Sequence, residues 1–200
     1  MYGNLHATRD EEAQREVFYN INFINFWLAS FCATCFGVLI GPFILMISNE
    51  TYLLDMIVTI LISLRLYLDM MRRAPWMFCE AAGIYWKGKT KPLWEVIVNL
   101  ITSLILVKYI GIAGIFLGTI ITILIIDLPV EPYLAFKYVL KKGIGKYYIK
   151  YALYFIVEIL MFASSYYACM LIPGAGIRSI YIKSNCSCNC YKFDYNYNNV

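Results

Sequence analysis

Charged side chains inside long apolar runs are the residues of this 200-residue chain whose types and spacing could do chemistry. Ionisable groups are costly within a bilayer and usually mark substrate or ion pathways there. Arg65 is the first, and Asp69 and Arg73 follow it at intervals of four residues. This spacing places all three on one helix face, where they can neutralise one another. Two interpretations follow: Arg65 extends toward the membrane surface and pairs with Asp69, or it binds an anionic substrate.

A second set of polar residues, Glu95, Asn99 and Ser103, also recurs every four residues within an apolar run. On a helix these side chains form a stripe that leads from one end of the run toward its middle. Such a stripe suits the wall of a water-filled cavity open to the cytoplasm, and it equally suits hydrogen bonding between helices. Both interpretations stay open on the sequence alone.

A single carboxyl group, Glu158, lies near the middle of the last apolar run, ten residues past Tyr148. At that depth a carboxyl could bind and release a proton near neutral pH, as a proton-coupled carrier requires. It could equally be a neutral hydrogen-bonding group. Glu158 is therefore the candidate coupling residue.

Cysteine and histidine indicate neither catalysis nor metal binding. Cys32 and Cys35 are one helical turn apart in an apolar run, where they act as small hydrophobic residues. The alternating cysteines from Cys186 to Cys190 match zinc-site spacing poorly, and His6 is the single histidine. We therefore predict no catalytic residue, no metal site and no cofactor, which disfavours a membrane acyltransferase or glycosyltransferase.

The elements that must position these residues are long apolar helices. Hydrophobic residues make up 61% of the chain and charged residues 15%, which indicates a membrane protein. This composition excludes secreted disulfide scaffolds, disordered chains and free nucleic-acid-binding modules. Apolar runs of roughly 20 residues predict an all-α polytopic bundle with about five transmembrane helices. Their expected bounds are 22–47, 52–71, 92–108, 112–128 and 148–172.

Basic residues are distributed unevenly over the predicted loops. Twelve of the 17 lysines and arginines lie before the first run, between the second and third, or between the fourth and fifth. The positive-inside rule then predicts a multi-pass protein of the cytoplasmic membrane, with a cytoplasmic N-terminus and membrane lipids as partners. Residues 1–20 are expected to form a cytoplasmic lead-in, and residues 173–200 an irregular, disordered tail. No nucleic-acid partner is expected.

Small residues at helical spacing predict where the helices pack. Gly37 and Gly41 lie on one side of the first run, and Gly111, Gly114 and Gly118 line the fourth. Helices in a bilayer associate through such residues because their backbones can approach closely. We expect both stripes to be packing faces.

Several short motifs between residues 79 and 142 follow the pattern of a known family. They are Lys91-Pro92, Glu95, Asn99-Leu100, Ser103, Gly111-Ile-Ala-Gly114, Gly118-Thr119 and Glu131-Pro132-Tyr133, followed by a basic run. In these features the chain resembles the C-terminal lobe of Wzx-type polysaccharide flippases, which belong to the superfamily of MATE and MurJ transporters. A more diffuse likeness extends over roughly residues 5–165.

The resemblance implies both a function and a larger context. Members of the family move lipid-linked oligosaccharide or polysaccharide repeat units across the membrane by alternating access between two lobes. Matched by motif, Glu95 and Asn99 are the characteristic positions. The resemblance also implies that the chain is part of one lobe, partnered by the missing lobe or another membrane subunit, and without activity alone. A small accessory or scaffold protein of cell-envelope polysaccharide assembly is the alternative.

Overall fold

The computed structural model describes residues 11–47, 54–141 and 143–171, and all regular structure within these ranges is helical. The predicted all-α class is therefore confirmed. The expected tail lies outside the described residues, as do His6 and the cysteines from Cys186 to Cys190. The elements are α2 (Glu11–Ile47), α3 (Met56–Met71), α4 (Arg73–Ala81), the 3₁₀ helix η2 (Ile84–Gly88), α5 (Lys91–Ile110), α6 (Ala113–Thr122), the π-helix η3 (Ile123–Asp127), α7 (Leu128–Leu134), the π-helix η4 (Ala135–Leu140) and α8 (Gly145–Leu171).

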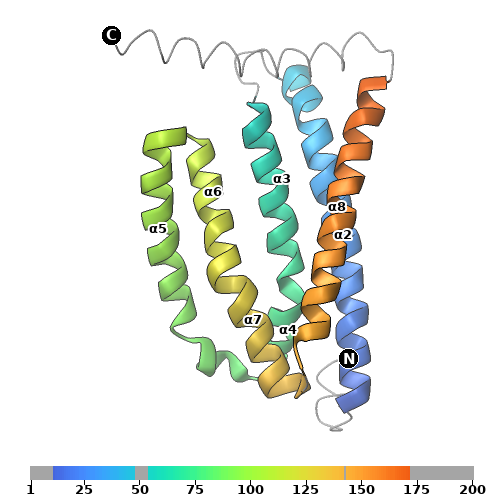
Figure 1. Ribbon diagram of the computed structural model, residues 1–200, viewed down its shortest axis with the longest axis vertical. Coiled ribbons are helices and arrows are strands. Elements are labelled where there is room, and N and C mark those ends of the chain that lie inside the picture. Colours follow the sequence, from blue (N-terminus) through green and yellow to red (C-terminus); the bar gives the residue numbers. More distant parts are fainter. Residues whose placement is uncertain (1–10, 48–53, 142, 172–200) are drawn as a thin grey trace.

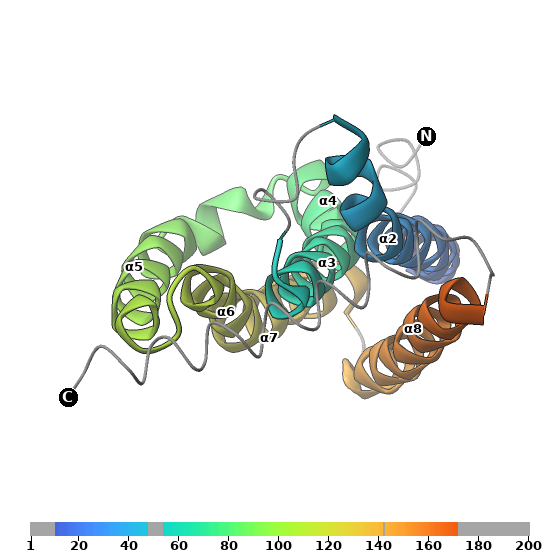
Figure 2. The same cartoon turned by 90° about the horizontal axis from the view of Figure 1, so that it is seen from above.

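The long helices stand side by side in one curved row (Figure 1, Figure 2). α5 packs on α6, α6 on α3, and α3 on α2, while α8 packs on α2 at the other end of the row. Because the row is one helix thick, many large apolar side chains stay exposed, among them Trp27, Leu104 and Leu160. A bilayer would cover such side chains with lipid tails or with further helices.

Among the described residues, four helical segments are long and apolar enough to cross a membrane: Glu12–Ile44, Lys91–Ile110, Ala113–Leu140 and Gly145–Cys169. The protein is thus an α-helical membrane protein. The predicted span 52–71 is described only as the 16 residues of α3, since residues 48–53 lie outside the described part. The start of α2 and the connections 72–90 and 141–144 share one end of the bundle, which we call the basic end (Figure 1).

The structure defines two helical segments further than the sequence does. α2 spans Glu11–Ile47, so the second half of the predicted lead-in 1–20 is helical, because glutamate and arginine are good helix formers. The helix expected to end near Leu128 instead continues to Leu140 through α6, η3, α7 and η4. Asp127 is buried against other charged groups here and does not mark the end of the segment.

Two prolines shape this long helical segment. The amide of Leu128 donates to the carbonyl of Ile123, five residues back, which widens the turn directly before Pro129. Pro132 lacks the N–H that would bond to the Leu128 carbonyl, and the hydroxyl of Tyr148 in α8 donates to that carbonyl at 3.2 Å. The lost backbone bond is therefore replaced by a contact between two helices.

The chain bends between α3 and α4. The helix breaks at Arg72, three residues before Pro75. Pro75 causes this break because it has no N–H to bond to the carbonyl of Met71. α4 and η2 then run along the basic end and lead the chain to the start of α5 (Figure 1). This course places Arg72 and Lys91 at the same end of the bundle.

Glycines bring α5 and α6 into direct contact. A Cβ atom on Gly118 would overlap Ser103, and one on Gly114 would overlap the backbone of Leu106. Gly111, in the turn between the two helices, has φ 64° and ψ −142°. Residues with a side chain rarely adopt this conformation, so the turn depends on glycine.

The contact between α2 and α8 uses a glycine and two stacked rings. A Cβ atom on Gly37 would overlap the ring of Phe162 in α8. Gly41, one turn further along α2, is half-buried. The rings of Phe26 and Tyr154 stack with their centroids 4.4 Å apart. These contacts fix α8 along α2.

An aromatic core closes the basic end. Phe18 from α2 contacts Phe78 of α4 and Phe136 of η4 with ring centroids 5.0 and 5.3 Å apart. Tyr147 from α8 completes the group, and its ring centroid lies 5.6 Å from that of Phe136. All four side chains are at most 2% exposed. Four elements are thereby held in fixed positions around the charged residues described next.

Candidate functional site

Arg72 lies at the centre of a cluster of charged residues at the basic end. Its guanidinium group forms an ion pair with Asp127, and its Nε lies 3.4 Å from Oε1 of Glu131. Its Nη1 also lies 3.5 Å from Oε1 of Glu95 and 3.9 Å from Oδ1 of Asp69. Because Arg72 follows the last residue of α3, it connects that helix to α5 and to the η3–α7 segment.

Lys91, the first residue of α5, is the second cation of this cluster. Its Nζ lies 2.6 Å from Oδ1 of Asp127 and donates a hydrogen bond to Glu131. Glu95, one turn further along α5, has Oε2 at 3.6 Å from the same nitrogen. The ammonium group also lies over the ring of Trp76, 5.2 Å from its centroid. A lysine is seldom buried without such partners.

Asp127 and Glu131 are the acidic centre of the cluster. They lie one turn apart, and their side chains are 0% and 1% exposed. The second carboxylate oxygen of Glu131, Oε2, is buried and has no hydrogen-bond partner among the described residues. Two cations, Arg72 and Lys91, thus face three carboxylates including Glu95, for a formal charge of −1. We call these five residues the ion cluster.

The stripe predicted on α5 divides into two parts. Glu95 belongs to the ion cluster, whereas Asn99 and Ser103 bond to each other and to α6. The Ser103 hydroxyl donates to Oδ1 of Asn99 at 3.1 Å, and the Thr119 hydroxyl of α6 donates to the same oxygen at 3.3 Å. This geometry matches hydrogen bonding between helices, the second of the two interpretations.

Arg65 lies outside the ion cluster and pairs locally. Its Nε is 3.5 Å from Oδ2 of Asp69, the residue one turn along, and both side chains are about two-fifths exposed. Asp69 also reaches Arg72, so it is the contact between this surface pair and the ion cluster. Arg73, the third residue of the predicted face, is exposed in α4 beyond the bend. The first interpretation of Arg65, pairing with Asp69, is the one this geometry matches.

Glu158 is buried between α8, α2 and α3. The hydroxyl of Thr34 donates to its Oε1 at 3.4 Å, while its Oε2 has no partner in the described part of the chain. The side chain borders a cavity of about 340 Å³ between α3 and α8, which also includes Tyr67 and Phe162. Apart from Glu158, Ser63 and Tyr67, this cavity is lined by apolar residues.

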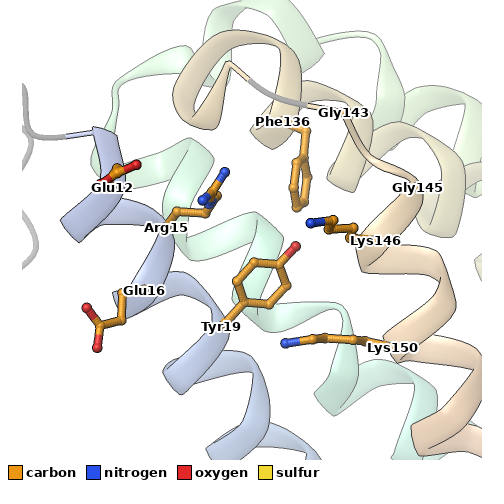
Figure 3. Close-up of a pocket in the computed structure, with 9 residues that line it drawn as sticks. All are labelled: Glu12, Arg15, Glu16, Tyr19, Phe136, Gly143, Gly145, Lys146 and Lys150. Atoms are coloured by element: carbon orange, nitrogen blue, oxygen red, sulfur yellow. The ribbon is translucent and has the colours of Figure 1, made fainter.

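A larger cavity, of about 940 Å³, opens at the basic end between α2, η4 and the start of α8 (Figure 3). Arg15 and Tyr19 of α2 face Lys146 and Lys150 of α8 across it. No ion pair joins these three basic residues to a carboxylate of the described residues. The sequence-based predictions include no residue of this cavity as a site residue.

Two ionisable groups at the connection between the spanning segments have shifted pKa values. Burial alone would lower the pKa of Arg72, but the nearby carboxylates of Glu131 and Asp127 outweigh it and raise that pKa above its ordinary value. Burial also raises the pKa of the Cys79 thiol to about 11. Arg72 is therefore a permanent cation, and Cys79 is a neutral thiol at physiological pH.

Sequence reasoning missed Arg72, Lys91, Asp127 and Glu131 as site residues. The sequence contained one usable signal, because Asp127 and Glu131 are four residues apart and fall on one face of any helix that continues past residue 128. No protein family, curated protein or solved structure matches the chain. In the ranges that the structure describes, no histidine, cysteine and acidic side chains group in a way that could hold a metal ion.

Proposed function

We propose that the chain is a transport protein of the cytoplasmic membrane that acts on lipid-linked oligosaccharides, as flippases do. The observation that carries the transport proposal is the ion cluster, in which Asp127, Glu131 and Lys91 are buried between spanning helices. Charged groups buried in membrane helices are costly and are found mainly where ions or substrates move. The substrate class comes from the motifs between residues 79 and 142.

The ion cluster suits a connection that opens and closes during transport. It joins the end of α3, the start of α5 and the η3–α7 segment through six ion pairs, of which four are 2.6–3.6 Å long and two are shorter. Its formal charge of −1 leaves room for one further positive charge, such as a proton. Binding of that charge would change the balance of attraction among the three elements, which alternating access requires.

Glu158 is the proposed coupling residue. Its side chain is not part of the ion cluster and borders an apolar cavity. One of its carboxylate oxygens has no hydrogen-bond partner among the described residues. A carboxyl group in this position can bind a proton when its surroundings are closed to water and release it when they open. The N-terminus is proposed to face the cytoplasm, because the basic end carries most of the basic residues.

Ligand binding tests this proposal most directly, because a partial transporter can still bind its substrate. The chain in lipid nanodiscs is titrated with a fluorescent lipid-pyrophosphate-linked oligosaccharide and, separately, with the same lipid carrying only a monophosphate. Saturable binding that prefers the oligosaccharide supports the proposal. Absence of saturable binding to either ligand contradicts it.

Transport and coupling are tested separately. Vesicles containing the chain and the fluorescent lipid are treated with a membrane-impermeant quencher, which reports lipid that has moved between leaflets. The partial chain alone should move little lipid, so coupling is measured on binding: the affinity of the native chain for the ligand should change with pH, and Glu158→Gln should remove this change while leaving ligand binding intact. A native chain that binds the ligand equally well at every pH contradicts the coupling role alone.

The accessory or scaffold function is the second candidate, and the one-helix-thick row favours it. No residue of the apolar window of α5 is fully buried, and its face away from α6 is exposed, so a neighbouring membrane protein could pack on it. Such a protein should copurify with the chain and be released by Leu104→Trp on the exposed face of α5. Oligosaccharide binding without any such partner would favour the transport function.

A further inference from the structure

The cavity at the basic end lies between α2, η4 and α8, and no residue of α5 or α6 lines it. Arg15 and Tyr19 lie on α2, Lys146 and Lys150 lie on the first turns of α8, and Phe136 of η4 forms the back wall. Phe136 also belongs to the aromatic core, which fixes the spacing of the three elements. The cavity of about 940 Å³ is therefore framed by rigid helices on three sides.

Three basic residues and two acidic residues line this cavity, so its lining is net positive. Figure 3 shows the ends of Arg15, Lys146 and Lys150 directed toward the space around the Tyr19 hydroxyl, while Glu12 and Glu16 lie on the α2 side, farther from the two lysines. Lys150 is further held by the ring of Tyr19, with its Nζ 4.1 Å from the centroid. None of the three cations forms an ion pair with a described carboxylate, so their charges are available to a ligand.

The position of the cavity selects the kind of anion. It lies at the ends of two membrane-spanning segments, Glu12–Ile44 and Gly145–Cys169, where lipid headgroups lie. Basic pockets between spanning helices at this depth bind phosphate headgroups, with aromatic rings against the glycerol and upper acyl carbons. The first turn of α8 also directs its positive helix end toward the cavity.

We propose that this cavity binds the phosphate headgroup of an anionic membrane lipid. Arg15, Lys146 and Lys150 contact the phosphate oxygens, and the Tyr19 hydroxyl donates a further hydrogen bond. The lipid then connects α2 to α8 at the basic end, in addition to the aromatic core and the contact of Lys150 with the Tyr19 ring. This site is separate from the ion cluster, and the proposal does not depend on the transport function.

Native mass spectrometry of the purified chain, equilibrated with equal amounts of phosphatidylglycerol and phosphatidylcholine, tests the proposal. We expect one phosphatidylglycerol to be retained in preference to phosphatidylcholine. The triple variant Arg15→Gln, Lys146→Gln and Lys150→Gln should lower its affinity about 100-fold, since each basic residue near a lipid surface contributes roughly a factor of five. Lys146→Gln alone, an exposed change that spares the fold, should lower it about fivefold.

A matched triple variant removes the same charge from the basic end outside the cavity: Arg73→Gln, Lys89→Gln and Lys137→Gln. It should retain phosphatidylglycerol like the native chain. An equal loss in both triple variants would show general surface attraction and overturn the proposal. Displacement by millimolar inorganic phosphate, without preference for either lipid, would assign the cavity to free phosphate and overturn the lipid ligand. Oligosaccharide binding measured on the same variants should be unchanged.

Discussion

Lys91 and Asp127 place their side-chain Nζ and Oδ1 atoms 2.6 Å apart, although they belong to different membrane-spanning segments. Lys91 begins α5, and Asp127 ends the π-helix η3. The pair therefore fixes the lower half of the α5–α6 hairpin, which is otherwise joined by glycine contacts near its turn. Because Asp127 is completely buried, the pair cannot be replaced by contact with water.

Removal of a cation from the ion cluster should cost more stability than removal of a carboxylate. Lys91→Gln leaves one cation, Arg72, facing three carboxylates, whereas Asp127→Asn leaves two cations and two carboxylates. We expect Lys91→Gln to lower the free energy of unfolding by about 3–5 kcal/mol, the usual cost of breaking a buried ion pair. Asp127→Asn should cost about half as much. Equilibrium unfolding in mixed micelles measures both.

Lys89→Gln is the matched control for this comparison. Lys89 is exposed, lies two positions before Lys91 and contacts Trp86 rather than a carboxylate. Its replacement should change the free energy of unfolding by less than about 0.5 kcal/mol. A greater loss for Asp127→Asn than for Lys91→Gln would contradict the surplus negative charge assigned to the cluster.

Two glycine contacts should respond differently to a compensating change. Gly37→Ala brings a methyl group against the ring of Phe162, and Gly118→Ala brings one against both the hydroxyl and the backbone of Ser103. Each should lower the free energy of unfolding by about 1–3 kcal/mol. Phe162→Leu should restore part of the loss at Gly37, because the atoms that must move there, the Phe162 ring and the Ser63 hydroxyl, belong to side chains.

Ser103→Ala should restore little at Gly118, because the Ser103 backbone atoms stay in place. Gly143→Ala is the control, since a Cβ atom on Gly143 meets no other atom within 4 Å. Full recovery of Gly118→Ala by Ser103→Ala would show that α5 and α6 are less closely packed than described.

Glu158 should react with a hydrophobic carbodiimide, a reagent that modifies protonated carboxyl groups in apolar surroundings. The apolar cavity beside Glu158, whose walls include Phe162 and Ile159, can admit the reagent. One carboxylate oxygen of Glu158 has no hydrogen-bond partner among the described residues. Asp127 and Glu131 should react far less, because they lie among the charged groups of Arg72 and Lys91 rather than beside an apolar cavity. Peptide mass spectrometry after labelling at neutral pH identifies the modified residue. Labelling of Glu131 with none at Glu158 would contradict the assignment of Glu158 as the proton-binding carboxyl and of Glu131 as an ion-paired one.

The Cys79 thiol should be slow to alkylate. With its pKa raised to about 11, roughly 0.1% of the thiol is ionised at pH 8, and the thiolate is the reactive form. The alkylation rate should rise about tenfold per pH unit up to pH 11. Because the unfolded thiol ionises near 9 and the folded one near 11, stability should fall as the pH rises between these values.

A chain whose other cysteines are replaced by serine measures this rate. Glu80→Cys with Cys79→Ser, in the same background, supplies the control, because Glu80 is the exposed neighbour on the same helix. That thiol should react with an ordinary pH dependence. Similar rates at the two positions would show that Cys79 is not buried.

Local spacing predicted part of the site, and contacts distant in sequence formed the rest. The pair Arg65–Asp69 follows directly from an interval of four residues on one helix. Glu95 was found as an ionisable group in an apolar run, but its partner Arg72 belongs to another helix, and no periodicity encodes that distance. Arg72 contributed to the sequence analysis as one of the loop charges that predict orientation, and Lys91 contributed both as such a charge and in the motif Lys91-Pro92, but neither was predicted as a site residue.

The fold followed from composition more fully than the site did. Apolar runs located the helices because a bilayer requires long apolar segments whose backbone groups are satisfied internally. Helix ends were less predictable, and the segment ending at Leu140 shows why. Asp127 and Pro129 resemble a boundary in sequence, yet ion pairs bury the first and a wide turn accommodates the second. Such compensation depends on the neighbouring helices.

The π-helix η3 makes the position of Asp127 tolerant of a change in chain length at this turn. A π turn holds about one residue more than an α turn, so deletion of one residue between Ile123 and Ile126 would let the segment become plain α-helix. The side chains beyond the deletion would keep nearly their present direction relative to α6, because the wide turn had absorbed the rotation of about 100° that one residue contributes. Asp127 and Glu131 would then still face Lys91, whereas deletion of one residue from the plain α-helix of α6 would turn them away by about 100°. Length variation at the π turn is thus a route by which such a bundle can lose one residue in one genetic step and keep its charged centre.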